Sequence, residues 1–444
     1  MFEKVLIADR GEIAVRIIYS LKEMGIRTVA VYSEADRESL PVILADEAVC
    51  IGPADIKQSY LNFASILSAA HVTGARAIHP GYGPLAENLE FVEACVDDGI
   101  TFIGSSVDSM TLMADKLAAK HAARSCGIPV VPGSTHVIEG DREALEVADE
   151  LGFPVILKAV GGGGGRGIKV VADRVDFLDT FYLAKQETKD YLKKPGIYVE
   201  KYLENARHVE FQILCDHTQH AIHLGDRDCT IQRRYQKIIE ESPAAGVDDE
   251  LRREMGRAAV NFVKSVGYSG IGTVEYLLMP DDSYYFSEMN TRIQVEHTVT
   301  EMVTGLDVVK QQVLIAAGGD LEYGQDDIVL RGHGIECRIM AEDPIRFTPS
   351  SGRINQYIPP GGPGVRVDSA VFCGAFINPY YDSLIAKLIV SAPDRPRAIR
   401  RMKRALDSFI IDGIETSIPM CVKIMNDQQF MRGYVDGSFI NHYL

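Results

Sequence analysis

The first third of the chain alternates short apolar runs with stretches in which apolar residues recur at helical spacing. Lys4–Ala8 and Arg27–Tyr32 are typical of buried strands, and the apolar positions of residues 12–24 predict a helix between them. A strand, a helix and a second strand in this order form a β-α-β unit with a parallel sheet, and similar alternation continues to Ile103. The turn Ala8–Ile13 lacks the Gly-x-Gly-x-x-Gly sequence, so we do not expect this sheet to bind a dinucleotide.

A second pattern, beyond the middle of the chain, predicts a β-hairpin. Gly272–Leu278 and Ser283–Ser287 are rich in β-branched and aromatic residues, and they flank the turn sequence Pro280-Asp281-Asp282. Such a turn places Glu275 opposite Glu288, and like charges that face each other across two strands are unfavourable. A bound cation removes this repulsion, and proteins hold Mg²⁺ with one or two carboxylates together with substrate phosphates. The sequence therefore predicts a magnesium or manganese site whose ligands are Glu275, Glu288 and the amide oxygen of Asn290.

Polar side chains then occupy every second position as the chain continues. In an extended backbone these side chains share one face, and they are Glu288, Asn290, Arg292, Gln294 and Glu296. Alternation alone is typical of a half-solvated strand. Beside the predicted metal site, however, carboxylates, amides and a guanidinium on one face indicate metal binding, anion binding and proton transfer.

A glycine-rich segment indicates a nucleotide-binding site. Gly161–Gly165 are consecutive glycines between the strand-like runs Phe153–Leu157 and Ile168–Val171, with Lys158 before them and Arg166 after them. A flexible linker is the alternative, but glycines also let backbone N–H groups approach phosphate oxygens closely. There is no Gly-Lys-Ser/Thr sequence, so this is not a Walker P-loop. We expect a hairpin that lies over nucleotide phosphates.

The densest basic run of the chain lies between these two features. It reads Gln232-Arg-Arg-Tyr-Gln-Lys237 in a protein whose formal net charge is −16. Most charged runs are solvated surface. Its position between the glycine-rich segment and the carboxylate hairpin favours instead a site for an anion such as bicarbonate or a γ-phosphate.

These motifs together resemble biotin carboxylase of the ATP-grasp superfamily, and the resemblance covers essentially the whole chain. The motifs that carry it are the glycine-rich hairpin, Tyr198–Glu204, His208-Val-Glu210, the run Gln232–Lys237 and Glu288–His297, together with Ala8–Ile13, His79–Gly83, Glu336–Ile339 and Pro379–Ser383. The implied fold is α/β and α+β with several domains. These are a Rossmann-like domain over 1–113, an ATP-grasp core over 114–330 with a mobile glycine-rich lid at about 131–203, and a mixed α+β domain over 331–444.

The resemblance also implies roles for individual residues. ATP would be bound by Lys116, Lys158, Gly163, Gly164, Gly165, Glu200, Lys201, Leu203, His208, Gln232 and Tyr235. Bicarbonate would be bound by Lys237, Arg292, Gln294 and the backbone of Val295, and Glu296 would deprotonate it. Arg338 would stabilise the enolate form of biotin, and Tyr82 would touch the biotin ring. The catalytic set is thus Glu296, Arg338, Lys237 and Arg292.

The implied activity is ATP-dependent carboxylation of biotin on a biotin carboxyl carrier protein, through carboxyphosphate, as the first half-reaction of acetyl-CoA carboxylase in fatty acid synthesis. The chain stops at Leu444 without a biotin attachment sequence, so we expect carrier and carboxyltransferase to be separate subunits, and by analogy a homodimer. Another ATP-grasp ligase and a nucleotide-binding regulator without turnover are the alternatives. Another ligase would give no reason for Tyr82 and Arg338 in these motifs. A regulator without turnover would tolerate substitution of Glu296 or Lys237, and neither residue is substituted.

Five positions depart from the family pattern without removing a proposed catalytic group. Tyr235 stands where the family usually has His, Thr298 where Pro is usual, and Asp9 where Asn is usual, and Pro84 and Ala86 also differ. We expect altered nucleotide affinity rather than loss of chemistry.

Composition and residue spacing exclude further kinds of partner and site. The net charge of −16 argues against a nucleic-acid partner. No window approaches the roughly 18 uninterrupted apolar residues of a membrane span. The eight cysteines lack a CxxC motif, so we expect reduced thiols in the cytoplasm. His217, His220 and His223 lack a fourth ligand, and we interpret them as turn and strand residues rather than a metal site.

Overall fold

The N-terminal part of the chain forms the predicted parallel sheet. The computed structural model describes residues 1–161, 167–191 and 196–443. Five strands lie in the order β3-β2-β1-β4-β5, and β1 pairs with β2 in parallel. Its strands are β1 (Lys4–Ile7), β2 (Arg27–Ser33), β3 (Glu47–Gly52), β4 (Ala77–His79) and β5 (Thr101–Phe102), and its helices are α1 (Gly11–Glu23), α2 (Leu40–Leu44), α3 (Phe63–Thr73), α4 (Leu89–Asp97) and α5 (Val107–Ala114). The predicted β-α-β unit is confirmed.

A long antiparallel sheet forms the centre of the molecule. Eight strands lie in the order β13-β12-β9-β10-β11-β14-β19-β17. They are β9 (Arg207–Cys215), β10 (Ala221–Arg233), β11 (Gln236–Ser242), β12 (Gly270–Leu278), β13 (Tyr284–Asn290), β14 (His333–Met340), β17 (Val365–Ser369) and β19 (Leu384–Ala392). Strands from the last third of the chain therefore extend the sheet beyond β11, which brings Arg338 on β14 next to the strand that carries Lys237.

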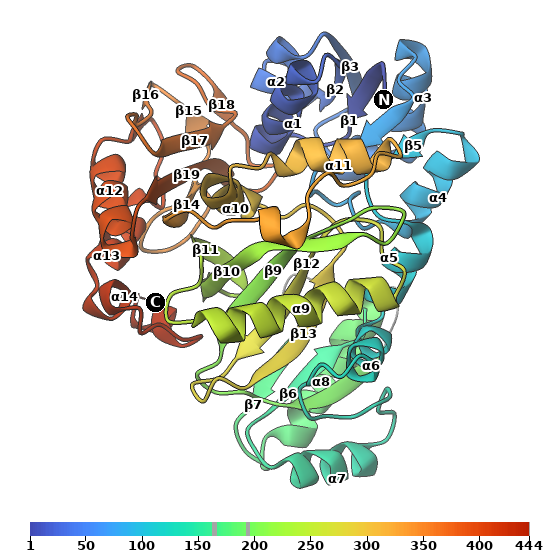
Figure 1. Ribbon diagram of the computed structural model, residues 1–444, viewed down its shortest axis with the longest axis vertical. Helices are drawn as coiled ribbons and strands as arrows, with labels where there is room; N and C mark the ends of the chain where they lie inside the picture. The colour runs from blue at the N-terminus through green and yellow to red at the C-terminus, as the bar shows by residue number, and fades with distance from the viewer. Residues whose placement is uncertain (162–166, 192–195, 444) are drawn as a thin grey trace.

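Helices cover this sheet. Helix α9 (Asp249–Ser265) lies across one face (Figure 1) and buries Met255, Ala259 and Phe262 against it. Helices α10 (His297–Thr304) and α11 (Val308–Ala316) pack between the central sheet and the N-terminal part. No helix among the described residues is long and apolar enough to cross a membrane.

A small separate sheet carries the glycine-rich hairpin. Strand β6 (Val155–Ala159) pairs with β7 (Ile168–Val171) and with β8 (Ile197–Lys201), both antiparallel. With α6 (Lys116–Ser125), α7 (Asp141–Leu151) and α8 (Phe177–Tyr191), these strands lie at the end of the molecule opposite the N-terminal sheet (Figure 1). The predicted hairpin is confirmed by the pairing of Lys158 with Ile168. Gly163, Gly164 and Gly165 lie outside the described residues.

The last part of the chain packs a second core against β14 and β19. This core contains Ile335, Leu388, Met402 and Ile424. The remaining helices and strands are α12 (Arg395–Asp407), α13 (Ile418–Asn426), α14 (Gln428–Arg432), β15 (Gly352–Arg353), β16 (Gln356–Ile358), β18 (Phe376–Ile377) and β20 (Ile410–Asp412).

The carboxylate hairpin is confirmed, but the predicted extended strand beyond it is wrong. Glu275 lies directly opposite Glu288 as predicted, although the turn centres on Asp281 and a β-bulge at Ser287 provides the extra residue that aligns the two acids. Strand β13 ends at Asn290, and residues 291–296 turn into α10. The reason is that the backbone N–H of Thr291 donates to the Glu87 carboxylate instead of to a neighbouring strand, and Ile293 turns into the core.

Candidate active site

Lys237 is the centre of a cluster of carboxylates. Its Nζ lies 2.5 Å from Glu296 Oε1, 2.6 Å from Glu210 Oε2 and 3.3 Å from Glu275 Oε1. These acids come from the end of the β13–α10 connection and from β9 and β12. Burial alone would lower the pKa of Lys237, but the negative charges around it raise that pKa well above its ordinary value. Lys237 is therefore a firmly charged ammonium inside a cluster of carboxylates.

A β-bulge directs the side chain of Lys237 towards this cluster. The pairing between β10 and β11 shifts from Ile231 with Ile239 to Gln232 with Lys237, which leaves Ile238 as an extra residue. Bulges of this kind re-aim side chains and are common beside active sites. As a result, Lys237 and Glu240 reach the same cluster although they are three residues apart. Lys237 contacts Glu296, and Glu240 contacts Arg338, which also contacts Glu296.

Glu296 is held by two cations. Its Oε1 accepts from Lys237, and its Oε2 accepts from Nη2 of Arg338 at 2.9 Å. Burial would raise the pKa of Glu296, but the charges of Lys237 and Arg338 outweigh it and hold the pKa below its usual value. An ionised, buried carboxylate with fixed orientation is what a general base requires.

A buried arginine that the sequence did not single out supports this cluster. Arg227 is fully buried, and its Nε donates to Glu210 at 2.7 Å while its Nη2 donates to Gln294 Oε1 at 2.7 Å. Gln294 in turn donates to Glu275 at 2.8 Å. Arg227 thus fixes both Glu210 and Gln294. The signal in the sequence was the charged segment Asp226-Arg-Asp228 in the middle of β10.

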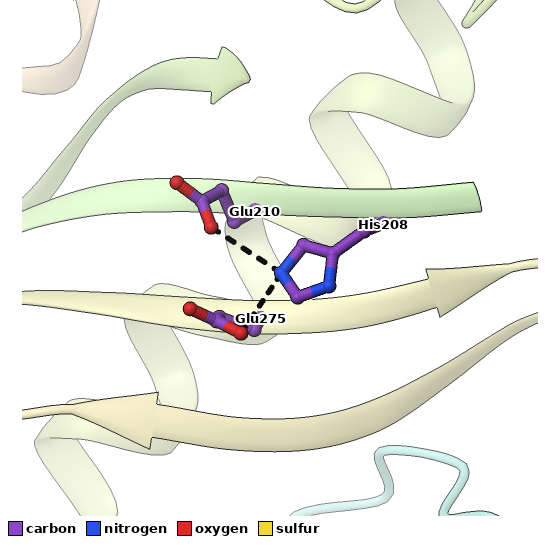
Figure 2. Close-up of side chains that lie close together, drawn as sticks. All are labelled: His208, Glu210 and Glu275. Atoms are coloured by element: carbon purple, nitrogen blue, oxygen red, sulfur yellow. Dashed lines mark ion pairs between the residues drawn. The ribbon is translucent and has the colours of Figure 1, made fainter. Parts of the chain in front are cut away.

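Glu275, the first predicted metal ligand, lies beside Glu210 and His208. Glu275, Glu210 and His208 bring their side-chain tips together on adjacent strands (Figure 2), and these atoms lie within 4.8 Å of one another. His208 Nε2 lies 2.8 Å from Glu275 and 3.4 Å from Glu210. Burial would lower the pKa of His208, but the charge of Glu275 and the contact with Glu210 raise it to about 10. Protonated His208 thus balances the two carboxylates in this structure.

The second predicted metal ligand, Glu288, pairs with a different cation. Its Oε2 lies 3.1 Å from Nζ of Lys116, and its side chain is 38% exposed. The charge of Lys116 is the largest influence on the pKa of Glu288, which falls to about 2. Asn290, two residues beyond Glu288, contacts the other acid: its Nδ2 donates to Glu275 at 2.7 Å and its Oδ1 accepts from Arg292 at 3.2 Å. The three predicted ligands are therefore neighbours.

The predicted bicarbonate residues surround the same cluster. Arg292 is anchored by Glu87, whose Oε2 accepts from Nε at 3.0 Å. The carbonyl oxygen of Val295 accepts from the buried ammonium of Lys387 at 3.0 Å. Glu87 and Lys387 were not predicted, because each comes from a distant part of the chain and neither lies in a local motif.

The predicted nucleotide residues are placed along the edge between the small sheet and the central sheet. Lys158 Nζ lies 2.6 Å from Glu200 Oε2, and Lys120 pairs with the other oxygen of Glu200. The ammonium of Lys201 donates to the carbonyl oxygens of Gly152 and Phe153, so it faces the loop before β6. Leu203, two residues beyond β8, is half-buried.

Gln232 and Tyr235 lie at the tight connection between β10 and β11. Gln232 Nε2 donates to the carbonyl oxygen of Cys229 at 2.8 Å. Tyr235 has a φ of +65° and is 49% exposed. Its ring is therefore available to a ligand, but the structure gives it no fixed partner among the described residues.

The predicted biotin residue Tyr82 lies between the N-terminal sheet and the central sheet. Its hydroxyl donates to Glu12, and its backbone N–H donates to Asp9 at 3.1 Å. Asp9, one of the unusual positions, also accepts from the N–H of Gly83. Burial raises the pKa of Asp9 to about 7. Asp9 thus shapes the backbone beside Tyr82.

Another unusual position, Thr298, has a definite contact. Its hydroxyl hydrogen-bonds to the buried carboxyl of Glu336, which lies directly opposite Glu240 across β11 and β14. A proline at this position has no hydroxyl, so Thr298 adds a partner for Glu336 beside the cluster.

Family models match nearly the whole chain. The model described as the N-terminal domain of biotin carboxylase matches residues 1–110, and that of the biotin carboxylase C-terminal domain matches residues 336–442. Between them, the model described as the ATP binding domain of the carbamoyl-phosphate synthase L chain matches residues 115–323.

Individual relatives agree with the family models. The chain is 52% identical to biotin carboxylase 1 of Bacillus subtilis, covering 100% of this chain and 99% of the relative. It is 51% identical to biotin carboxylase of Pseudomonas aeruginosa, covering 100% and 99%.

Solved structures confirm the fold class. A complex of Campylobacter jejuni biotin carboxylase with β,γ-ATP has a TM-score of 0.98 at 45% identity, covering 100% of this chain and 99% of that chain. The biotin carboxylase domain dimer of Hydrogenobacter thermophilus 2-oxoglutarate carboxylase, with MgADP, ADP and bicarbonate, has a TM-score of 0.96 at 46% identity, covering 100% and 98%. The chain belongs to the biotin carboxylase family.

Proposed function

We propose that this chain carboxylates biotin with bicarbonate and ATP, as the biotin carboxylase subunit of an acetyl-CoA carboxylase. The observation that carries the proposal is the position of Glu296. It lies between Lys237 and Arg338, and Lys237 also contacts Glu275, one of the facing pair of acids on β12 and β13. A base, two cations and a pair of acids in one buried cluster suit the activation of bicarbonate beside a nucleotide phosphate.

The first step joins bicarbonate to the γ-phosphoryl group. Bicarbonate is a weak nucleophile, so Glu296 removes its proton as an oxygen attacks the γ-phosphorus and the bond to ADP breaks. Lys237 and Arg292 offset the charge that develops on the attacking anion. Gln294, fixed by Arg227, and the backbone of Val295, fixed by Lys387, orient it. The product is carboxyphosphate.

The donor set on β12 and β13 fits Mg²⁺ or Mn²⁺. Two carboxylates and an amide oxygen are hard oxygen ligands, and in this structure His208 and Lys116 neutralise the two acids. Glu275, Glu288 and Asn290 would hold the metal, which supplies charge neutralisation of the phosphoryl oxygens.

The second step transfers carbon to biotin. Carboxyphosphate breaks down to CO₂ and phosphate, and phosphate takes the proton from the ureido nitrogen N1′ of biotin. Arg338 stabilises the resulting oxyanion, and the nitrogen attacks CO₂. Tyr82 contacts the biotin ring.

Exclusion of water protects the unstable intermediate. We assign this task to the glycine-rich hairpin and to a mobile lid at about residues 131–203, which closes over ATP held by Lys116, Lys158 and the 200–203 segment. The lid is part of an ATP-grasp domain over 114–330, between a domain over 1–113 and a C-terminal domain over 331–444.

The partners follow from the reaction. The biotin is attached to a carrier protein, and a carboxyltransferase uses the carboxybiotin. We infer a homodimer, because the related domain from Hydrogenobacter thermophilus is described as a dimer. All eight cysteines are unpaired thiols, which supports a cytoplasmic location.

The discriminating experiment measures ADP release from the purified chain while bicarbonate and free biotin are omitted in turn. We expect release to require bicarbonate and to accelerate with biotin. Turnover indifferent to biotin would indicate another ATP-grasp ligase, and ATP binding without any turnover would indicate a nucleotide-binding regulator.

A further inference from the structure

Arg338 is held between two carboxylates that come from different parts of the chain. Its Nε donates to Glu240 Oε1 at 2.5 Å, and its Nη2 donates to Glu296 Oε2 at 2.9 Å. Its Nη1 has no hydrogen bond to the described residues. Glu240 is 0% exposed, and its other oxygen, Oε2, is buried without a hydrogen-bond partner among the described residues. Glu240 therefore has Arg338 as its ion-pair partner.

This arrangement limits how Arg338 meets Glu296. A guanidinium readily pairs with a carboxylate through two parallel hydrogen bonds. Here Glu240 occupies Nε, so Glu296 receives a single hydrogen bond from Arg338 and keeps its Oε1 for Lys237. Without the Glu240 carboxylate, Nε and Nη2 of Arg338 can both donate to Glu296. Such pairing makes Glu296 a weaker base and turns Arg338 away from a second ligand.

We propose that Glu240 is a positioning residue, which holds Arg338 by its Nε so that Glu296 remains a base and the Nη1 side of the guanidinium faces the biotin carbonyl. The inference rests on the proposed function and deepens it. Glu240 does not touch the reacting atoms in this account but acts through Arg338.

The surroundings of Glu240 set the pH range in which it can hold Arg338 as a carboxylate. Burial raises the pKa of Glu240 to about 7, although Arg338 lowers it, so the ion pair is complete only above neutral pH. The groups that face it are Arg338, Glu296 and Lys237, the carboxyl of Glu336, and the thiols of Cys229 and Cys337. Burial also raises the pKa of Glu336 well above its usual value, and the carboxyl of Glu336 hydrogen-bonds to Thr298 rather than to Arg338.

The test compares Glu240→Gln with Glu241→Gln. Glu241 is the next residue of β11, is also buried, and also pairs with an arginine, but its partners are Arg395 and His333 on the other side of the strand. Both variants lose one buried carboxylate, so a general loss of stability affects both. Steady-state rates are measured as a function of biotin and of pH, with ATP binding as the test of folding.

We expect Glu240→Gln to raise the KM for biotin about 10- to 100-fold, as expected for loss of a charge-assisted hydrogen bond. We also expect the acid limb of the pH profile of bicarbonate-dependent ADP release to move to lower pH, because Glu296 gains a second contact with Arg338. Glu241→Gln should change neither. An unchanged KM and an unchanged acid limb in Glu240→Gln, or equal changes in both variants, would overturn the proposal.

A second comparison covers the case in which Glu240→Gln is too unstable to purify. Arg338→Ala is compared with the double variant Arg338→Ala/Glu240→Gln. The double variant removes both charges of the pair, so neither is left buried without its partner. Equal KM values for biotin support action through Arg338, and a further rise in the double variant overturns it. If the proposed function itself fails, the unmodified chain shows no biotin-dependent ADP release, so the two failures are distinguishable.

Discussion

Nζ of Lys237 lies 2.5 Å from Oε1 of Glu296, so the proposed base and a proposed anion-binding cation are already in contact. In the proposed mechanism bicarbonate binds beside this pair, where Lys237 would help to hold the anion and Glu296 would accept its proton. The contact also keeps the pKa of Glu296 low, so the base is ionised at neutral pH.

Replacement of the base tests its role in proton removal. Glu296→Gln should bind ATP normally but lose about 10²- to 10⁴-fold of the bicarbonate-dependent ADP release, which is the usual contribution of general base catalysis. Nucleotide binding is measured by fluorescence titration and turnover by a coupled ADP assay. A variant with the rate of the unmodified chain would remove Glu296 from the mechanism.

Replacement of Arg338 should separate the two steps. Arg338→Ala should retain bicarbonate-dependent ADP release without biotin, because Lys237 and Arg292 remain to bind bicarbonate. Formation of carboxybiotin should fall at least about tenfold, since a charge-assisted hydrogen bond to the biotin oxyanion is lost. Carboxybiotin is measured with labelled bicarbonate, and an undiminished yield would contradict the assignment.

The acid pair on the β12–β13 hairpin predicts a specific change in metal requirement. Glu288→Gln should raise the Mg²⁺ or Mn²⁺ concentration for half-maximal ADP release at least about tenfold, because one of the two anionic ligands is lost. Asp281→Asn, in the exposed turn of the same hairpin, is the control. Equal metal dependence in the two variants would place the metal elsewhere.

Glu241 predicts a pH-dependent contribution to stability. Burial would raise its pKa, but hydrogen bonds from His333 and Arg395 lower it from 4.5 to about 2. The lowered pKa stabilises the fold by about 3 kcal/mol above pH 4.5, and this contribution disappears as the pH falls towards 2. Glu241→Gln should therefore lower the urea midpoint at pH 7, and the difference should shrink below pH 4.5. Equal midpoints at pH 7 would show that the pair contributes nothing.

The sequence predicted those parts of the site that depend on local geometry. The β-branched and aromatic runs around Pro280–Asp282 predicted the hairpin, and the facing of Glu275 and Glu288 is as predicted, but the turn does not produce it alone: the turn centres on Asp281, and a bulge at Ser287 shifts the register by one residue. The same reasoning was wrong beyond Asn290. Glu296 reaches Lys237 because the chain turns into α10, and that turn depends on Glu87, about 200 residues away in the sequence.

The residues that sequence reasoning missed are buried charges with distant partners. Glu240 and Lys387 each lie in a strand, where a local pattern cannot distinguish a buried charge from a solvated one. Their roles become visible once β14 and β19 are known to join the sheet beside β11. The aim of Lys237 likewise depends on the β-bulge at Ile238, for which the sequence has no glycine or other signal.

Transfer of oxygen from bicarbonate to phosphate tests most directly whether bicarbonate attacks ATP. Attack of a bicarbonate oxygen on the γ-phosphorus leaves that oxygen in the phosphate that is released. With ¹⁸O-labelled bicarbonate, ATP and biotin, we expect phosphate that carries one labelled oxygen, and its rate of appearance should fall in Glu296→Gln together with ADP release. Phosphate that carries oxygen from water alone would show that bicarbonate does not attack ATP in this protein.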